Sequence, residues 1–131
     1  MSDSVPSIWA LFWHFNAIKL FEKEITQYIP KLGEFFSPCQ VFCKRIYATK
    51  SQMTPEIRNL LEELIGISFN WALSGTDEGV DSLFENNVKF TLQQHPEISH
   101  IMLIAPEKQV TKIRNAFPLV EIKTVQSFSD F

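Results

Sequence analysis

The chain has 131 residues, a length that fits one domain, with the core expected at about residues 8–125. Its 45% hydrophobic and 21% charged residues are ordinary for a folded globular protein and exclude a disordered chain. The net charge of −3 disfavours general binding to nucleic acid, because proteins that clamp nucleic acid electrostatically are normally basic. A local basic patch, or a metal-dependent site that handles phosphates, stays open.

Strands and helices alternate in the first third of the chain. Residues 8–13 form a nearly continuous apolar run, which is typical of a strand covered on both faces. We expect a helix to follow, with Asn16 as its N-cap and with Pro30 and Gly33 ending it. Residues 39–47 are rich in aromatic and β-branched side chains and predict a second strand.

The same alternation continues to the end. Thr54 and Pro55 predict the start of a second helix, as a capping hydroxyl followed by proline at the first helical position, and Gly66 ends it. The later elements are expected as strands over 67–73, 101–105 and 119–125, helices over 80–94 and 106–117, and a tail of six residues. This order predicts an α/β three-layer sandwich with a five-stranded parallel sheet in the order 3-2-1-4-5.

In such sheets, ligands bind beyond the carboxyl ends of the strands, where the strand order reverses. The loops expected at this place carry His14, Asn16 and Glu107 together with three acids after the third strand, Asp77, Glu78 and Asp81. Carboxylates of this kind can hold Mg²⁺ or Mn²⁺, which activate water at a phosphodiester. Acids near helix starts also serve simply to complement the helix dipole, so a structural role stays open.

A small basic group surrounds the second strand. Lys44, Arg45 and Lys50 are candidates for contacts with RNA phosphates, and a solvated surface is the alternative. Cys39 and Cys43 are too close in sequence to form a disulfide framework, and no apolar run reaches the roughly 18 residues of a transmembrane helix. We therefore expect a cytoplasmic protein that does not span a membrane.

Four segments together resemble NYN domains, which have the PIN-like ribonuclease fold. They are residues 8–18 (IWALFWHFNAI), 44–47 (KRIY), 79–81 (GVD) and 101–110 (IMLIAPEKQV), in the family's order and spacing. The resemblance implies a metal-dependent ribonuclease site at the carboxyl edge of the sheet. On this alignment, Asn16 and Asp81 match residues of the family's motifs.

Departures from the family pattern fall on the acids of the implied site. His14 stands where the family has its first metal-binding Asp, Glu107 replaces the first Asp of the fourth-strand motif, and Gln109 replaces the second. Histidine is a poor ligand for Mg²⁺ and a better one for Mn²⁺. The implied catalytic residues are thus Asp81, Glu107, His14 and Asn16, with His14, Asp81 and Glu107 as the metal ligands.

Three functions remain open at this point. The first is a degenerate NYN domain that is catalytically weak or inactive and binds single-stranded RNA or a protein partner. The second is an active metal-dependent endoribonuclease, and the third is an unrelated doubly wound domain with a structural or assembly role. Because 12 of the residues are Phe, an exposed apolar patch and a homodimer are also expected.

Overall fold

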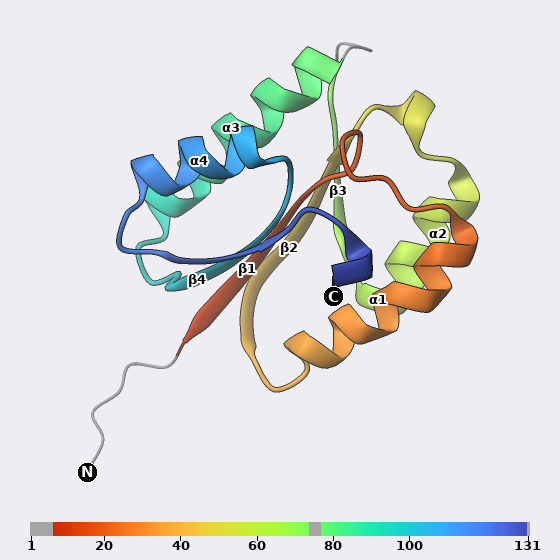
Figure 1. The fold of residues 1–131 in the computed structure, drawn as a ribbon, viewed down its shortest axis with the longest axis horizontal. Helices are drawn as coiled ribbons and strands as arrows, with labels where there is room; N and C mark the ends of the chain where they lie inside the picture. Colours follow the sequence, from red (N-terminus) through yellow and green to blue (C-terminus); the bar gives the residue numbers. More distant parts are fainter. Residues whose placement is uncertain (1–6, 74–76, 131) are drawn as a thin grey trace.

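Five parallel strands form the sheet of this computed structural model, which describes residues 7–73 and 77–130 (Figure 1). The strands are β1 (Ile8–His14), β2 (Gln40–Ala48), β3 (Ser68–Trp71), β4 (His100–Ile104) and β5 (Glu121–Val125). Their order in the sheet is β3-β2-β1-β4-β5, and every neighbouring pair is parallel. The predicted fold class and strand order are confirmed.

Helices cover both faces of the sheet. The helices are α1 (Glu22–Phe36), α2 (Pro55–Ile65), α3 (Asp77–Gln94) and α4 (Glu107–Ala116), with short 3₁₀ turns η1 (Lys50–Gln52) and η2 (Phe128–Asp130). Figure 1 shows α1 and α2 on one face of the sheet and α3 and α4 on the other. The arrangement is the three-layer sandwich that the alternation of elements predicts.

The central position of β1 explains its apolar sequence. Leu11 and Trp13 point into the core beneath α1 and α2, whereas Ala10 and Phe12 point into the core beneath α3 and α4. All four side chains are fully buried. Successive side chains of a strand face opposite sides of the sheet, so a strand with helices on both sides needs an apolar residue at every position.

The first helix differs from the prediction at both ends. It begins at Glu22, where the Glu24 carboxylate accepts a hydrogen bond from the Phe21 N–H at 3.2 Å, so Asn16 is not its N-cap. It also runs through Pro30 and Gly33 and ends at Phe36. A stripe of buried side chains continues past the proline and compensates for the backbone hydrogen bond that Pro30 cannot donate. The stripe consists of Ile25, Ile29, Leu32 and Phe36.

The second helix follows its sequence signals closely. The Thr54 hydroxyl accepts from the Ile57 N–H at 3.2 Å, Pro55 stands at the first helical position, and Gly66 ends the helix. Gly66 adopts φ +63°, a left-handed conformation that glycine takes without steric cost. The third helix starts at Asp77, three residues before its predicted start at Val80.

Within the expected tail, the described residues 126–130 do not hang free. After β5 the chain turns back, and Phe128 is buried at 4% exposure. Its ring lies 5.1 Å from the ring of Trp13 and 6.0 Å from that of Tyr28. The segment after β5 therefore closes the core at the carboxyl end of β1.

Candidate functional site

The carboxyl ends of the central strands meet at one edge of the sheet. In the strand register, His14 at the end of β1 lies opposite Tyr47 of β2, and Trp13 lies opposite Ile104 of β4. The loop after β1 is held close to this edge, because the buried indole of Trp13 donates to the carbonyl of Ile18 at 2.8 Å. This edge is where the strand order reverses and where a ligand site is expected.

His14 and Asp81 form the best-defined polar contact at this edge. The Nε2 of His14 lies 2.6 Å from Oδ1 of Asp81, and the imidazole is buried at 1% exposure while the carboxylate is 33% exposed. The other ring nitrogen, Nδ1, accepts a hydrogen bond from the Ala17 N–H at 3.3 Å. In the neutral ring the proton therefore sits on Nε2 and is donated to Asp81.

Asn16 fastens the loop after β1 to the end of β2. Its Oδ1 accepts from the Thr49 N–H at 3.1 Å, and its Nδ2 donates to the Thr49 hydroxyl at 3.3 Å. Thr49 is buried, and its hydroxyl also lies 3.2 Å from that of Ser51. Asn16 therefore holds the loop after β1 against the residue that follows β2, and it is not the predicted helix cap.

The two residues at the start of α4 differ in their surroundings. The exposed Glu107 accepts a hydrogen bond from the Gln126 side chain. Gln109 is buried at 2% exposure, and its Oε1 has no hydrogen-bond partner among the described residues. An amide oxygen carries no net charge, so Gln109 does not replace the carboxylate that the NYN pattern has at this position.

The described side chains do not form a donor set that fits a bound Mg²⁺. Among residues 7–73 and 77–130, no three His, Cys, Asp or Glu side chains gather closely enough to hold a metal ion. His14 and Asp81 meet, but Glu107 does not join them in such a group. Glu78 is exposed, and the side chain of Asp77 lies outside the described part of the structure.

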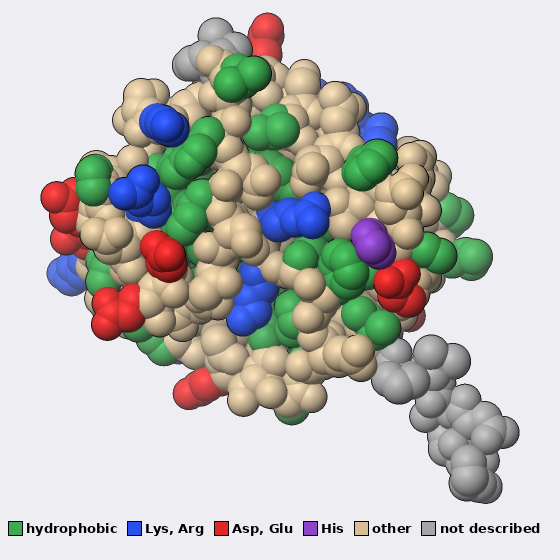
Figure 2. Space-filling view, turned by 180° about the vertical axis from the view of Figure 1, so that it is seen from behind, with side chains coloured by type: hydrophobic (Ala, Val, Ile, Leu, Met, Phe, Trp, Pro, Cys, Tyr) green, Lys and Arg blue, Asp and Glu red, His purple; other side chains and the backbone are tan. Residues whose placement is uncertain are grey.

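The three residues of the predicted basic group, Lys44, Arg45 and Lys50, lie in different surroundings. The ammonium of Lys44 donates to the Ile65 carbonyl at 3.1 Å, whereas Arg45 donates to Asn87 and Thr91 on α3. Lys50 is exposed on η1. Adjacent residues of a strand face opposite sides of the sheet, which is why Lys44 and Arg45 have different neighbours. Their role as RNA-binding residues stays a prediction. Figure 2 shows Lys and Arg side chains spread over the face that it presents.

The arginine belongs to a polar network between β2 and α3. The Tyr47 hydroxyl donates to the same Asn87 oxygen that accepts from Arg45. Burial raises the pKa of Tyr47, against the smaller lowering effect of the neighbouring Arg45 charge. Burial likewise raises the pKa of the Cys43 thiol, which disfavours the reactive thiolate.

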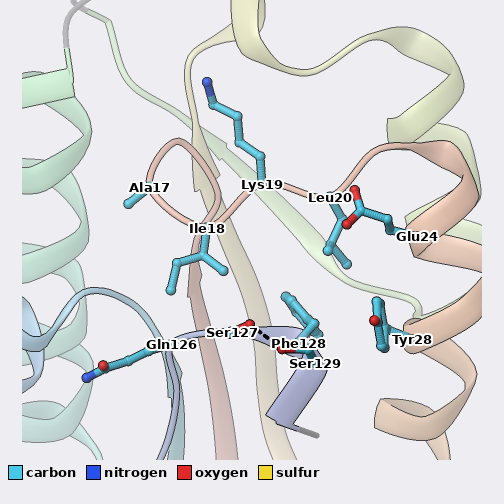
Figure 3. Close-up of a pocket in the computed structure, with 10 residues that line it drawn as sticks. All are labelled: Ala17, Ile18, Lys19, Leu20, Glu24, Tyr28, Gln126, Ser127, Phe128 and Ser129. Carbon is cyan, nitrogen blue, oxygen red and sulfur yellow. Dashed lines mark hydrogen bonds between the residues drawn. The ribbon is translucent and has the colours of Figure 1, made fainter.

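One pocket opens between the loop after β1 and the segment after β5 (Figure 3). It has a volume of about 270 Å³. Several of its polar groups are already engaged, because Glu24 accepts from the backbone and the hydroxyls of Ser127 and Ser129 lie 2.8 Å apart. In Figure 3, the rings of Tyr28 and Phe128 lie next to each other at the side of the pocket nearest α1.

Two further pockets adjoin each other at the carboxyl ends of β2 and β3. Both are lined by Lys50 and Trp71, and the smaller one is also lined by Arg58. Sequence reasoning missed Trp71 and Arg58. The available signal was an aromatic residue near the end of a predicted strand, at the edge where ligands bind.

Comparisons with known proteins leave the family open. No protein-family model matches the chain, and no curated protein matches it either. Within the described residues, none of the helices has the length and apolar character needed to cross a membrane.

Proposed function

We propose that this chain is a degenerate NYN-type domain of the PIN-like nuclease fold, which binds single-stranded RNA without metal-dependent cleavage. The observation that carries the proposal is the His14–Asp81 pair. The resemblance implies carboxylates at both positions, and the pair replaces a shared negative charge with an internal hydrogen bond. An active metal-dependent endoribonuclease is the competing function.

The geometry of the pair opposes metal binding in two ways. The Nδ1 of His14 faces a backbone N–H, and its Nε2 carries the proton that Asp81 accepts. A cation bound at the same Asp81 oxygen would lie beside this N–H, whose partial charge has the same sign. Metal binding at Nε2 would require loss of the proton and of a 2.6 Å hydrogen bond.

RNA is favoured as the ligand by two considerations. The family that the sequence resembles acts on RNA, and the exposed Lys50 stands at the carboxyl edge of the sheet. A net charge of −3 requires that any such contact be local, with few phosphates neutralised. Binding is therefore expected to be weak to moderate and sensitive to salt.

The test combines cleavage and binding on one labelled single-stranded RNA. Cleavage is measured with Mg²⁺ and with Mn²⁺ for the native chain, Asp81→Asn and the exposed neighbour control Glu78→Gln. Binding is measured by fluorescence anisotropy in the presence of a chelator. We expect no cleavage by any of the three proteins and equal RNA binding with and without divalent cations.

Two results would overturn the proposal. Robust Mg²⁺-dependent turnover that Asp81→Asn abolishes and Glu78→Gln leaves intact would establish the active endoribonuclease instead. Absence of RNA binding at low salt would refute the proposed RNA binding and favour a protein partner. Restoration of some cleavage by His14→Asp would support the loss of an ancestral metal site.

A further inference from the structure

The two pockets around Trp71 differ in size and chemistry. The smaller, of about 200 Å³, lies between η1, the start of α2 and the end of β3, and it is lined by Lys50, Arg58, Trp71 and three neighbours. The larger, of about 620 Å³, is lined by Trp71, Lys50 and the polar residues Thr49 and Ser51, among others. The larger volume falls within the range of about 300–1,000 Å³ that is usual for ligand sites.

Both pockets have basic side chains in their lining, Lys50 in each and Arg58 in the smaller one. Lys50 and Arg58 are exposed, and neither forms an ion pair within the described part of the chain. No carboxylate is found among the described residues that line either pocket. In the smaller pocket, two cations that have no ion pair and no lining acid among the described residues favour an anionic ligand, and the planar guanidinium of arginine suits a phosphate in particular.

The indole of Trp71 is held in place while it borders both cavities. Phe69, two residues earlier on the same face of β3, stacks on it with ring centroids 5.8 Å apart and ring planes 10° apart. Trp71 is half-buried and packs against the core beneath α1 and α2. A fixed, partly exposed indole offers a base a stacking surface whose ordering cost is already met by the fold.

We propose that these adjoining pockets form a nucleotide-binding subsite. A phosphate occupies the smaller pocket between Lys50 and Arg58, and the attached base stacks on Trp71 at the boundary with the larger pocket. The ligand class is a nucleotide, either free or as one unit of single-stranded RNA. The RNA source rests on the function proposed above, whereas binding of a free nucleotide does not.

Substitutions at three positions test the subsite on the full chain. Arg58→Gln and Lys50→Gln remove the charges, and Trp71→Leu removes the stacking surface, whereas Trp71→Phe keeps an aromatic ring. The matched control is Arg114→Gln, because Arg114 is also exposed on a helix but lies in the last turn of α4, at the opposite edge of the sheet. Circular dichroism and urea unfolding verify that each variant folds.

Binding of a short labelled single-stranded RNA and of a nucleoside monophosphate is measured for every protein. Loss of the stack in Trp71→Leu should weaken binding by roughly 5- to 150-fold, and Trp71→Phe should recover most of it. One neutralised phosphate predicts a slope of about −0.7 for the logarithm of the RNA association constant against the logarithm of the salt concentration. Each charge substitution should bring the slope closer to zero, with no change for Arg114→Gln.

The results for RNA and for the free nucleotide test the subsite and the proposed RNA binding separately. RNA binding that is unaffected by all four pocket variants would overturn the subsite and leave RNA binding by the domain intact. Binding of the monophosphate that Arg58→Gln and Trp71→Leu abolish would support the subsite even if RNA does not bind. Failure of both ligands to bind the native chain would overturn the subsite and the RNA half of the proposed function together.

Discussion

Replacement of Asp81 by alanine tests the His14–Asp81 pair independently of any ligand. The change removes the acceptor of the His14 Nε2–H, and the His14 side chain is only 1% exposed. A buried donor without an acceptor costs about 1–3 kcal/mol of stability. Two effects reduce this cost. Asp81 is 33% exposed, so water can enter the space left by the carboxylate, and alanine gains up to about 0.7 kcal/mol of helix propensity in α3. We expect the free energy of unfolding to fall by about 1–2 kcal/mol.

Urea unfolding at neutral pH, followed by circular dichroism, measures this difference directly. Asp81→Asn keeps an acceptor oxygen and should lose about 1 kcal/mol, while Ser82→Ala, an exposed neighbour on the same helix, should change stability by less than about 0.5 kcal/mol. Equal stability of Asp81→Ala and Ser82→Ala would refute the structural role of the pair. An increase in stability would show that Asp81 is retained at a cost for function.

Three further predictions concern packing and pH. Phe12→Ala, at a fully buried position of the central strand, should lower the free energy of unfolding by about 3–5 kcal/mol in calorimetric or urea unfolding. The control Phe90→Ala, at a position that is 60% exposed, should lower it by less than about 0.5 kcal/mol. A loss below about 1 kcal/mol for Phe12→Ala would contradict the core position of Phe12. Phe128→Ala should cost about 3 kcal/mol, and no loss of melting temperature would mean that the segment after β5 is free. Because burial raises the Cys43 pKa, the unfolded chain loses this thiol proton at lower pH than the folded chain. The free energy of unfolding should therefore fall as pH rises above the ordinary cysteine pKa, and a decline unchanged in Cys43→Ala would exclude this thiol as its cause.

Much of the fold could be predicted because it rests on local patterns. The apolar run of β1 and the cap signals of α2 each predict an element without knowledge of its neighbours. The course of α1 could not be predicted in this way, because Pro30 is a strong local stop signal that contacts far away in the sequence override. The burial of Phe128 likewise depends on Trp13, which lies more than a hundred residues earlier in the chain.

The candidate site was predictable in position but not in pairing. The rule that ligands bind at the carboxyl edge of parallel strands placed His14 and Asp81 together, and the structure brings them to 2.6 Å. It did not reveal that Glu107 bonds to Gln126, since that contact depends on how the chain turns after β5. The separation of Lys44 from Arg45 was available from strand alternation and was overlooked. The predicted homodimer stays a prediction.

The distribution of partners along the carboxyl edge is an argument for the proposed binding surface over a catalytic one. Metal-dependent hydrolysis needs carboxylates that are free to hold a cation and orient water. In the centre of this edge, Asp81 accepts from His14, Asn16 bonds to Thr49, and Glu107 accepts from Gln126, so each of these three side chains already has a partner within the protein. The cations of Lys50 and Arg58, by contrast, face open pockets beside an aromatic ring. Acids with partners in the centre, and cations to one side that form no ion pair among the described residues, support the proposed surface that holds an anion without transforming it.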